Sequence, residues 1–464
     1  MTSSVKKIHY DAAVIGSGQG GNPLAHFLAK EGYKTALIEK EHVGGTCVNE
    51  GCTPTKTMVA SARVAYMADR AEDYGVHTGN VELDLSEVRE RKRKIVESFR
   101  KGNLKRIKEE PGLDLIRGVA SFTGPYKLRV SREANEKKIK AEKIFIDTGT
   151  RPTAPPIEGL ENLDYLDSTS IMELGETPEK LIIIGGGYIG VEFGQMFRRF
   201  GSDVIILQRS SQLLTHEDRD IAEEVASILE EDGIKIELNS DVQKVEETDG
   251  GETLVTAEKN GENISIEGSH LLAAAGRRPN TDKLNLESTK VQTDGRGYIK
   301  VNEKLETDQE NIWALGDVKG GPAFTHISYD DFRIIRDNLF GEGTASTEDR
   351  AVPYTVFMDP QLGRIGLTEK EAKEEGYDFD VAKMPMNRVA RALEVDEKRG
   401  VMKALVESDT GQILGAAVLG IEGGEIASAI QIAMMGGLTY RDLKEGVFAH
   451  PTLAESLNNL FASL

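Results

Sequence analysis

Apolar and polar positions follow the same order in two separate stretches of the chain. The first stretch has an apolar run at Tyr10–Ile15, the glycine-rich turn Gly16–Gly21, a helical pattern at Asn22–Glu31 and a second apolar run at Lys34–Glu39. Short apolar runs bounded by glycine are typical of strands that are buried on both faces, as in a parallel sheet. This stretch therefore predicts a strand–helix–strand unit with a tight turn after its first strand.

The second stretch repeats this order between Leu181 and Leu207. An apolar run at Leu181–Ile184 precedes the turn Gly185–Gly190, a helical pattern at Val191–Phe200 and the run Asp203–Leu207. Because the whole order recurs with its own glycine turn, the sequence predicts two units of the same kind.

Both stretches also end alike. Each is closed by a short apolar strand that runs into Gly-x-Arg-Pro, at 144–152 and at 271–279. A polar, alternating segment with hairpin character precedes each closing strand, at 127–140 and at 244–268. We therefore expect an α/β fold with two Rossmann-like dinucleotide-binding domains, the second inserted into the first.

The glycine turns carry the first candidate chemistry. Each turn reads Gly-x-Gly-x-x-Gly, a spacing that lets the backbone approach a pyrophosphate whose charge lies on the amide groups of a helix N-terminus. The glycines are Gly16, Gly18 and Gly21 in the first turn and Gly185, Gly187 and Gly190 in the second. Glu39, at the end of a strand, is placed to accept hydrogen bonds from ribose hydroxyl groups. The alternative is a glycine-rich turn that binds no nucleotide.

The second unit differs at the position that corresponds to Glu39. Its strand ends in Gln208, Arg209 and Ser210, so that a cation and a hydroxyl group stand where the first unit has an acid. These groups suit the 2′-phosphate of NADPH, which a carboxylate would repel. The second site is therefore predicted to prefer NADPH, unless Arg209 is only a solvated surface residue.

Composition narrows the class of protein. The chain has 464 residues, which corresponds to about three domains, and its 39% hydrophobic residues are typical of a globular protein. The net charge of −20 excludes a broad nucleic-acid surface and disfavours docking on an anionic membrane. The chain has no apolar run long enough to span a membrane and lacks the pattern of a secretory signal, so we expect a cytoplasmic protein.

The two cysteines, Cys47 and Cys52, lie close together in the sequence. Positions i and i+5 do not share one face of a regular helix, so a contact between the sulfurs requires a distorted turn that enters a helix, and Gly51 and Pro54 provide the irregularity. Thiols at a helix N-terminus have lowered pKa values and react as thiolates. Because further cysteines and nearby paired histidines are absent, we expect no metal site and interpret the pair as a redox-active disulfide.

With these residues, the chain resembles the pyridine nucleotide–disulfide oxidoreductases, the family of dihydrolipoamide dehydrogenase, glutathione reductase and mercuric reductase. The resemblance covers essentially the whole length, and the cysteine and histidine segments are its most specific parts. The segments that carry it are 16–21, 44–56, 185–192, 276–280, 311–317, 353–366 and 448–455.

The resemblance implies FAD in the first site and a nicotinamide cofactor in the second, NADPH with NADH as the alternative. The residues implied for FAD are Gly16, Gly18, Gly21, Glu39, Gly45, Thr46, Lys56, Gly149 and Asp317. The residues implied for the nicotinamide cofactor are Gly185, Gly187, Tyr188, Gly190, Gln208, Arg209, Ser210 and Gly276.

The resemblance also implies individual roles. Asp317 would bind the ribityl chain of FAD; the alternative is a helix N-cap at the end of a strand, which is compatible with that role. Lys56, one helical turn after Cys52, would lie near the flavin N5 atom and pair with Glu192, although its spacing alone fits a solvated lysine. Tyr188 would cover the nicotinamide pocket until NADPH displaces it, and the alternative is a packing role.

A histidine and a glutamate complete the implied catalytic set. Glu455 follows His450 by five residues and would fix the tautomer of its ring and stabilise the cation. The family places this pair across a dimer interface, which implies a homodimer whose active site needs both chains. Electrons would pass from NADPH through FAD to Cys52 and Cys47, with Cys47 as the interchange thiol and His450 as its proton carrier.

The implied domain organisation has four parts, of which the last is a C-terminal α+β dimerisation domain. The parts are 1–155 and 280–350 for the FAD-binding domain, 156–279 for the NAD(P)H-binding domain and 351–464 for the dimerisation domain. Apolar runs at Gly400–Val406 and Ile413–Leu419 predict two strands of the last part.

Departures from the family patterns bear on the substrate. Mercuric reductases usually carry a C-terminal cysteine pair, and a tyrosine where this chain has His450. Dihydrolipoamide dehydrogenases keep the histidine but normally have an acid in place of Gln208 and Arg209. Glu50, between the cysteines, replaces an apolar residue; its carboxylate would raise the pKa of a neighbouring thiol and attract a metal cation, or face solvent without such a role.

The redox segment and the segments 317–331 and 353–368 resemble most the mercuric-reductase-like proteins without the terminal cysteines, which include a copper(II) reductase of reactive-chlorine resistance. The leading hypothesis is an NADPH-dependent flavoprotein that reduces a small disulfide or a thiophilic metal ion such as Cu(II) or Hg(II). The alternatives are a dihydrolipoamide dehydrogenase and a non-catalytic flavin-binding redox sensor.

Overall fold

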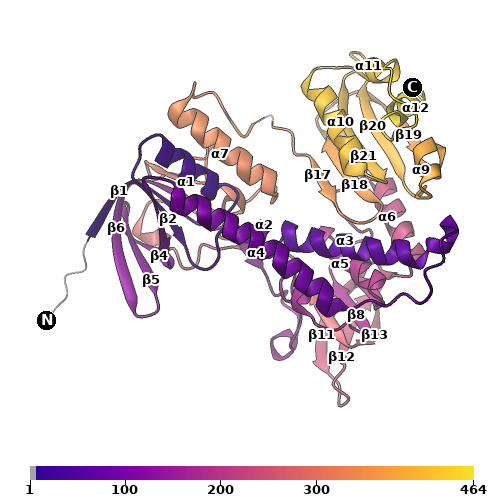
Figure 1. The fold of residues 1–464 in the computed structure, drawn as a ribbon, viewed down its shortest axis with the longest axis horizontal. Coiled ribbons are helices and arrows are strands. Elements are labelled where there is room, and N and C mark those ends of the chain that lie inside the picture. Colours follow the sequence, from indigo (N-terminus) through magenta and orange to yellow (C-terminus); the bar gives the residue numbers. More distant parts are fainter. Residues whose placement is uncertain (1–6, 349) are drawn as a thin grey trace. The chain divides into compact units, whose positions relative to one another are not determined.

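The computed structural model describes residues 7–348 and 350–464, which Figure 1 traces from end to end. The chain divides into two compact units. The first comprises the chain up to Thr57 with Glu90–Thr153 and Gly276–Arg350, and the second comprises Met58–Arg89, Ala154–Ala275 and Ala351–Leu464. Residues 58–89 thus group with the second unit. The finer division at 155, 279 and 350 stays a prediction.

A seven-stranded sheet lies at the centre of the first unit. Its strands are β1 (Lys7–Ile15), β2 (Thr35–Glu39), β3 (Leu113–Arg117), β4 (Val119–Gly124), β5 (Lys127–Arg132), β6 (Asn135–Ile146) and β16 (Ile312–Ala314). The order is β3-β2-β1-β6-β5-β4, and β16 also pairs with β6. The pairs among β3, β2, β1, β6 and β16 are parallel, whereas β4, β5 and the start of β6 form the expected antiparallel segment.

Helices cover one face of this sheet. The helices of the first unit include α1 (Gly21–Lys30), α2 (Gly45–Asn49) and α7 (Thr325–Phe340), and Figure 1 shows α1 and α7 beside each other. Alternate residues of β1 point to opposite faces, so that Ala12 and Val14 pack with the two helices and Ala13 and Ile15 pack on the other side. Burial on both faces explains why the strand is apolar throughout.

The second unit contains the repeated nucleotide-binding pattern. Its parallel sheet has the order β10-β9-β8-β14, formed by β8 (Lys180–Ile184), β9 (Asp203–Leu207), β10 (Lys235–Glu237) and β14 (His270–Ala273). The helices α5 (Tyr188–Arg199) and α6 (Arg219–Glu231) accompany it, and β11 (Ser240–Glu247), β12 (Thr253–Lys259) and β13 (Glu262–Gly268) form an antiparallel sheet. Ile221, Val225 and Leu229 of α6 are buried at helical spacing, and each such side chain contributes about 1.5–3 kcal/mol to folding.

The C-terminal part of the second unit is a five-stranded antiparallel sheet in the order β17-β18-β21-β20-β19. Its strands are β17 (Tyr354–Val356), β18 (Gln361–Gly366), β19 (Phe379–Pro385), β20 (Val401–Glu407) and β21 (Ile413–Gly420). Its helices are α8 (Glu369–Glu374), α9 (Ala390–Glu394), α10 (Gly423–Met435), α11 (Tyr440–Lys444) and α12 (Ser456–Phe461). The helix α10 packs on β18 and β21.

Two long helices, α3 (Cys52–Asp69) and α4 (Leu85–Glu109), have residues in both units. A two-stranded sheet is formed by β7 (Thr150–Pro152) and β15 (Arg277–Pro279). The 3₁₀ turns are η1 (Ala71–Tyr74), η2 (Leu160–Asn162), η3 (Ser170–Glu173), η4 (Leu286–Ser288), η5 (Gly316–Lys319) and η6 (Met386–Arg388).

The predicted α/β class with two Rossmann-like parts and a C-terminal α+β part is confirmed. The helix expected from Val191 begins earlier, at Tyr188, because its first turn lies inside the glycine motif. Within the described ranges, no helix combines the length and apolar character needed to cross a membrane.

Candidate functional site

The first glycine turn, between β1 and α1, leaves no room for side chains. Gly16 has a φ of +104°, and a Cβ atom at this position would lie 2.1 Å from the carbonyl oxygen of Asp147. A Cβ at Gly18 would lie 2.6 Å from Asp147 Oδ2, and one at Gly21 would lie 2.4 Å from the carbonyl oxygen of Gly16. Close packing against backbone at Gly16 and Gly21, and against the Asp147 side chain at Gly18, therefore requires glycine at all three positions.

Glu39 lies at the end of β2 with its carboxylate turned to this glycine turn. Its Oε2 atom accepts hydrogen bonds from the backbone N–H (3.1 Å) and hydroxyl (2.7 Å) of Ser17, and Oε1 accepts from the N–H of Glu41 (2.9 Å). A carboxylate accepts about four hydrogen bonds. The buried Glu39 therefore retains capacity for a ribose hydroxyl group.

The two Gly-x-Arg-Pro segments pair with each other, which the sequence analysis did not anticipate. In the antiparallel sheet of β7 and β15, Thr150 Oγ1 donates to Asp317 Oδ2 (3.0 Å) and accepts from Arg277 Nε (2.8 Å). Gly149 precedes β7 with a φ of +64°, and Gly276 precedes β15 with a φ of +138°. The duplicated segment was the available signal for this pairing, and Thr150 and Arg277 position Asp317.

The cysteine segment forms two helices separated by a break. Cys47 lies in the short helix α2, which ends before Glu50, and Cys52 is the first residue of α3. Cys47 is half-buried and Cys52 is exposed. Cys52 Sγ lies 3.3 Å from the hydroxyl oxygen of Thr325, the first residue of α7. The expected distorted turn that enters a helix is present.

The electrostatics of Cys47 differ from the expectation for a thiol at a helix N-terminus. The pKa of Cys47 is raised, first by its hydrogen bond with Cys52 and then by burial, while a hydrogen bond with Thr325 and the charge of Lys56 act in the opposite direction. The expected lowering is therefore wrong for Cys47, because a second thiol and burial outweigh the effect of its place in the first turn of α2.

The redox segment packs directly on the first glycine turn. Gly45, at the start of α2, has a φ of +63°, and a Cβ there would lie 2.6 Å from Gly18 Cα. Thr46 follows as an exposed residue. The segment that carries Cys47 is therefore in backbone contact with the first predicted dinucleotide site.

The second glycine turn, between β8 and α5, is built in the same way. Gly185 has a φ of +111°, and a Cβ there would lie 2.6 Å from the carbonyl oxygen of Ala274. A Cβ at Gly190 would lie 1.9 Å from the carbonyl oxygen of Gly185, whereas one at Gly187 would meet nothing within 4 Å. Contacts with neighbouring backbone thus require glycine at positions 185 and 190, whereas Gly187 faces open space.

Gln208 occupies in the second unit the place of Glu39 in the first. Its Oε1 atom accepts the backbone N–H of Gly186 at 3.1 Å, and its Nε2 donates to the carbonyl oxygen of Gln212 at 3.3 Å. Arg209 is exposed and Ser210 is half-buried. An amide therefore stands beside this turn where the first turn has a carboxylate.

Tyr188 is the first residue of α5, and its ring centroid lies 5.3 Å from that of Tyr354 in β17. Burial raises the pKa of Tyr188, and a hydrogen bond with Tyr354 opposes that shift. Tyr354 in turn donates a hydrogen bond to the buried carboxylate of Glu217. Tyr188 thus has a packing partner, and its role over the nicotinamide pocket stays a prediction.

Glu192 is buried in α5, where Oε1 accepts the backbone N–H of Phe357 at 2.8 Å. Lys56 lies on α3 one turn after Cys52, as expected. Lys56 belongs to the first unit and Glu192 to the second, and their pairing stays a prediction.

His450 and Glu455 are brought together, as their spacing predicts. Nδ1 of His450 lies 2.8 Å from Oε2 and 3.0 Å from Oε1 of Glu455. Because a carboxylate only accepts hydrogen bonds, Nδ1 carries a proton. The side chain of His450 is 67% exposed, and its role as a proton carrier stays a prediction.

Comparison with known proteins identifies the family. The family model described as pyridine nucleotide-disulphide oxidoreductase matches residues 10–331, and the model of its dimerisation domain matches residues 352–461. The chain belongs to the pyridine nucleotide-disulphide oxidoreductases. The predicted family and its oxidoreductase class are thereby confirmed, and the family implies a flavin and a nicotinamide cofactor.

Individual relatives of this oxidoreductase match over nearly the whole chain. The probable pyridine nucleotide-disulfide oxidoreductase RclA of Escherichia coli is 41% identical over 98% of this chain and 99% of its own. A mercuric reductase of Staphylococcus aureus is 38% identical over 97% of this chain and 81% of its own. The solved Cu(II) complex of the flavoprotein disulfide reductase RclA has a TM-score of 0.90 at 40% identity and covers 98% of this chain and 100% of that chain.

A cluster of carboxylates in this oxidoreductase has metal-ligand geometry. Asp218, Asp220 and Glu369 offer oxygen atoms that all lie within 4.8 Å of one another. The ammonium group of Lys403 already lies among them, at 3.2 Å from Asp218, 2.8 Å from Asp220 and 2.5 Å from Glu369. The lysine, which is 2% exposed, places its positive charge among the carboxylates, where a bound cation would otherwise lie.

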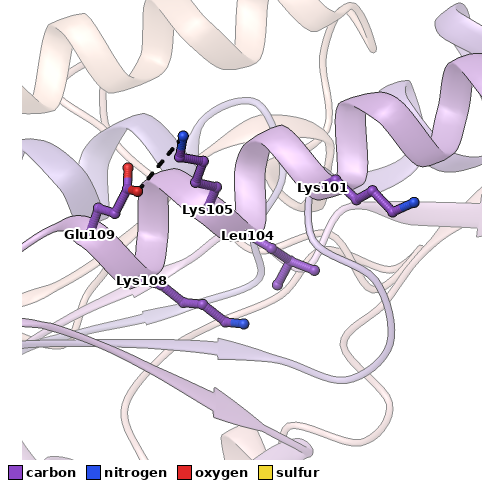
Figure 2. Close-up of a pocket in the computed structure, with 5 residues that line it drawn as sticks. All are labelled: Lys101, Leu104, Lys105, Lys108 and Glu109. Carbon is purple, nitrogen blue, oxygen red and sulfur yellow. Dashed lines mark ion pairs between the residues drawn. The ribbon is translucent and has the colours of Figure 1, made fainter.

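A surface hollow lies along α4, as Figure 2 shows. It is lined by Lys101, Leu104, Lys105, Lys108 and Glu109. Lys105 pairs with Glu109 at 3.9 Å, and Lys101 and Lys105 are each 74% exposed. The hollow contains none of the predicted site residues, and its exposed lysines are typical of a solvated helix face.

Proposed function

We propose that this oxidoreductase is an NADPH-dependent FAD enzyme that passes electrons through Cys47 and Cys52 to a small disulfide or a thiophilic metal ion such as Cu(II) or Hg(II). The observation that carries the proposal is the contact between Gly45 and Gly18, because it joins the dithiol segment to the first dinucleotide turn. Electrons need such proximity to move from a bound cofactor to a thiol pair.

The residues of the first site fit FAD. The glycine turn supplies close backbone approach for a diphosphate, and Glu39 has hydrogen-bonding capacity for a ribose. Asp317, held by Thr150, would bind the ribityl chain, with Gly149, Gly45, Thr46 and Lys56 around the flavin end. When bound, FAD supplies the two-electron carrier between the nicotinamide and the cysteine pair.

The second site is assigned to NADPH. A neutral amide at Gln208 and the exposed cation of Arg209 replace the carboxylate that the first site presents. Neither group repels a 2′-phosphate, and the guanidinium of Arg209 attracts it. Ser210 adds a hydroxyl donor, and Tyr188 would cover the nicotinamide.

The cysteine pair would transfer electrons to the acceptor. With a disulfide acceptor, the thiolate of Cys47 attacks one sulfur and releases the first product thiolate, and Cys52 then attacks the mixed disulfide, releases the second thiolate and closes the Cys47–Cys52 disulfide. With Cu(II), the same two electrons reduce two ions to Cu(I), and the two thiols lose two protons as the disulfide forms.

A base would assist the reaction because the pKa of Cys47 is raised, first by its hydrogen bond with Cys52. His450 of the partner subunit would provide it in a homodimer, with Glu455 stabilising the ring as it becomes charged. The match of residues 352–461 to a dimerisation domain and the exposed Ile432 and Met435 of α10 support a homodimer. We assign 1–155 and 280–350 to FAD binding, 156–279 to NADPH binding and 351–464 to dimerisation, in a cytoplasmic enzyme.

Two relatives support a metal acceptor. One is a mercuric reductase by name, and the other, RclA, has been solved as a Cu(II) complex. Glu50, half-buried between the cysteines, would contribute a carboxylate beside the thiols. A preference for NAD with rapid turnover of dihydrolipoamide would instead indicate dihydrolipoamide dehydrogenase.

Anaerobic titration of the purified protein with NADPH tests the relay. After two electrons, a long-wavelength absorbance band of a thiolate beside the flavin should appear, and its absence in protein with intact flavin would refute the relay. Cys47→Ser should keep the band and lose acceptor turnover, whereas Cys52→Ser should lose both. A panel of lipoamide, glutathione disulfide, Cu(II), Hg(II) and quinones then ranks the acceptors, and no turnover with any would favour a redox sensor.

A further inference from the structure

Asp147 is a buried carboxyl group that the sequence analysis did not assign. It follows the last residue of β6, and it is 7% exposed. Its Oδ2 atom accepts the backbone N–H of Gly21 at 2.7 Å. Gly20, the N-cap residue of α1, makes no capping bond through a side chain, so Asp147 caps this helix from a strand that is distant in sequence.

The carboxyl group of Asp147 touches both turns that are proposed to hold FAD. A Cβ at Gly18 would lie 2.6 Å from Oδ2, and one at Gly21 would lie 2.8 Å from the same atom. On the other side, a Cβ at Gly316, next to Asp317, would lie 2.6 Å from Oδ1. Asp147 therefore lies between the glycine turn of α1 and the turn η5.

The charged groups that face Asp147 are mostly acidic. Burial raises its pKa well above the usual 3.8, the bond from Gly21 opposes this shift, and the charges of Asp317, Asp331 and Glu39 add to it. The nearby cations Lys319 and Arg350 bind Asp331, at 3.3 Å and 2.7 Å. Among the ion pairs of the described residues, none includes Asp147.

A diphosphate at the N-terminus of α1 would bring further negative charge to this carboxyl group. Like charges at short distance in a buried site disfavour each other, so an ionised Asp147 would oppose the bound cofactor. A protonated carboxyl group removes this repulsion, still accepts the N–H of Gly21 and gains an O–H donor.

Building on the proposed FAD site, we propose that Asp147 is a cofactor-binding residue that carries a proton when FAD is bound, so that FAD binding takes up a proton at this side chain. By linkage, loss of that proton weakens FAD binding to the same extent as FAD favours the proton. One linked proton changes the dissociation constant by at most about tenfold per pH unit. The affected range lies above the ordinary value for an aspartic acid, and binding weakens as pH rises.

The test measures FAD release from the holoenzyme across pH 5–9. The fluorescence of released FAD on serial dilution gives the dissociation constant at each pH, for the natural protein and for Asp147→Asn. The asparagine keeps an acceptor for Gly21 and carries no charge. The natural protein should bind FAD more weakly as pH rises, and Asp147→Asn should remove that linked slope and bind about tenfold or more tightly at the alkaline end.

Glu142→Gln is the matched control. Glu142 is an exposed residue of β6, so the variant removes the same formal charge from the same strand. It should follow the natural protein, and a slope that flattened equally in Glu142→Gln would overturn the proposal, since net charge would then explain the effect. An unchanged slope in Asp147→Asn would also overturn it and leave Asp147 only as a helix cap.

Proton release gives a second readout. In weakly buffered solution with a pH indicator, loss of FAD should release up to one proton per flavin from the natural protein, and measurably less from Asp147→Asn. Equal release from both would contradict the proposal even if one variant were less stable. Protein that binds no flavin at any pH would refute the proposed function itself, and it is recognised by the missing flavin absorbance.

Discussion

The contact between the redox segment and the nucleotide turn rests on one glycine, Gly45, and the chain contains a matched control for it. Gly45 and Gly149 have almost the same left-handed backbone, with φ values of +63° and +64°. A Cβ at Gly45 would lie 2.6 Å from Gly18 Cα, whereas one at Gly149 would meet nothing within 4 Å. Alanine at the two positions therefore separates backbone strain from steric overlap.

The expected losses in stability follow from backbone strain and steric overlap. An L-residue in the left-handed region costs about 1–2 kcal/mol, and the reduced freedom of the unfolded chain offsets about 0.4–1 kcal/mol of that. Gly149→Ala should therefore destabilise the protein by about 1 kcal/mol. Gly45→Ala adds a steric overlap with the backbone of Gly18, which cannot move away as a flexible side chain can, and this overlap costs about 1–3 kcal/mol more.

Urea unfolding of the FAD-free protein measures both variants, so that a contact of the new methyl group with FAD does not enter the comparison. Gly45→Ala should unfold at a clearly lower urea concentration than Gly149→Ala, and its holoenzyme should also release FAD more readily than the natural protein. Equal midpoints for the two variants would refute the packing of the redox segment on the glycine turn.

Three further predictions concern the nucleotide, the base and a buried cation. Gln208→Glu should keep the hydrogen bond to Gly186 but place a negative charge about 5 Å from a 2′-phosphate, and at an effective dielectric constant of about 20 this repulsion costs about 3 kcal/mol. The value of kcat/KM should therefore fall up to about a hundredfold for NADPH and little for NADH. An equal fall for both nucleotides would contradict the assignment of NADPH. His450→Ala should slow acceptor reduction about a hundredfold while stopped-flow flavin reduction by NADPH stays unchanged, and an equal loss in both half-reactions would argue against a role as base. Lys403→Met should lower stability by about 1.5–3 kcal/mol at pH 7, because three carboxylates lose the buried cation that they share. Each of them keeps one other cation, Arg364, Lys383 or Lys373. Since Lys403 holds the pKa of Glu369 below its usual value, its contribution is present above about pH 4.5 and is lost on acidification, so thermal unfolding should show the two proteins converging at low pH.

Much of the site was predictable because its signals are local. The glycine spacing predicts the turns at Gly16–Gly21 and Gly185–Gly190, and the spacing of Cys47 and Cys52 predicts an irregular entry into a helix, which is the break between α2 and α3. The five-residue spacing of His450 and Glu455 likewise places them in contact. Each of these features depends on backbone geometry over a few residues.

The pKa of Cys47 shows where local reasoning fails. The N-terminus of a helix lowers the pKa of a thiol, but Cys47, in the first turn of α2, is also half-buried and shares a hydrogen bond with a second thiol. The direction of the shift is therefore set by burial and by a neighbour that the sequence places nearby without specifying the distance.

By itself, the sequence determined the two strand–turn–helix units, the identity of the glycines that make the turns tight, and the chemical types available at each site, because periodicity and side-chain volume are properties of short segments. Only the tertiary structure decided that the two Gly-x-Arg-Pro segments pair, that Gly45 rests on Gly18, and that Asp147 is buried between two turns. These features join residues that are far apart in the chain, and the energies involved depend on burial and on the distances between charges. Both quantities exist only once the chain has folded.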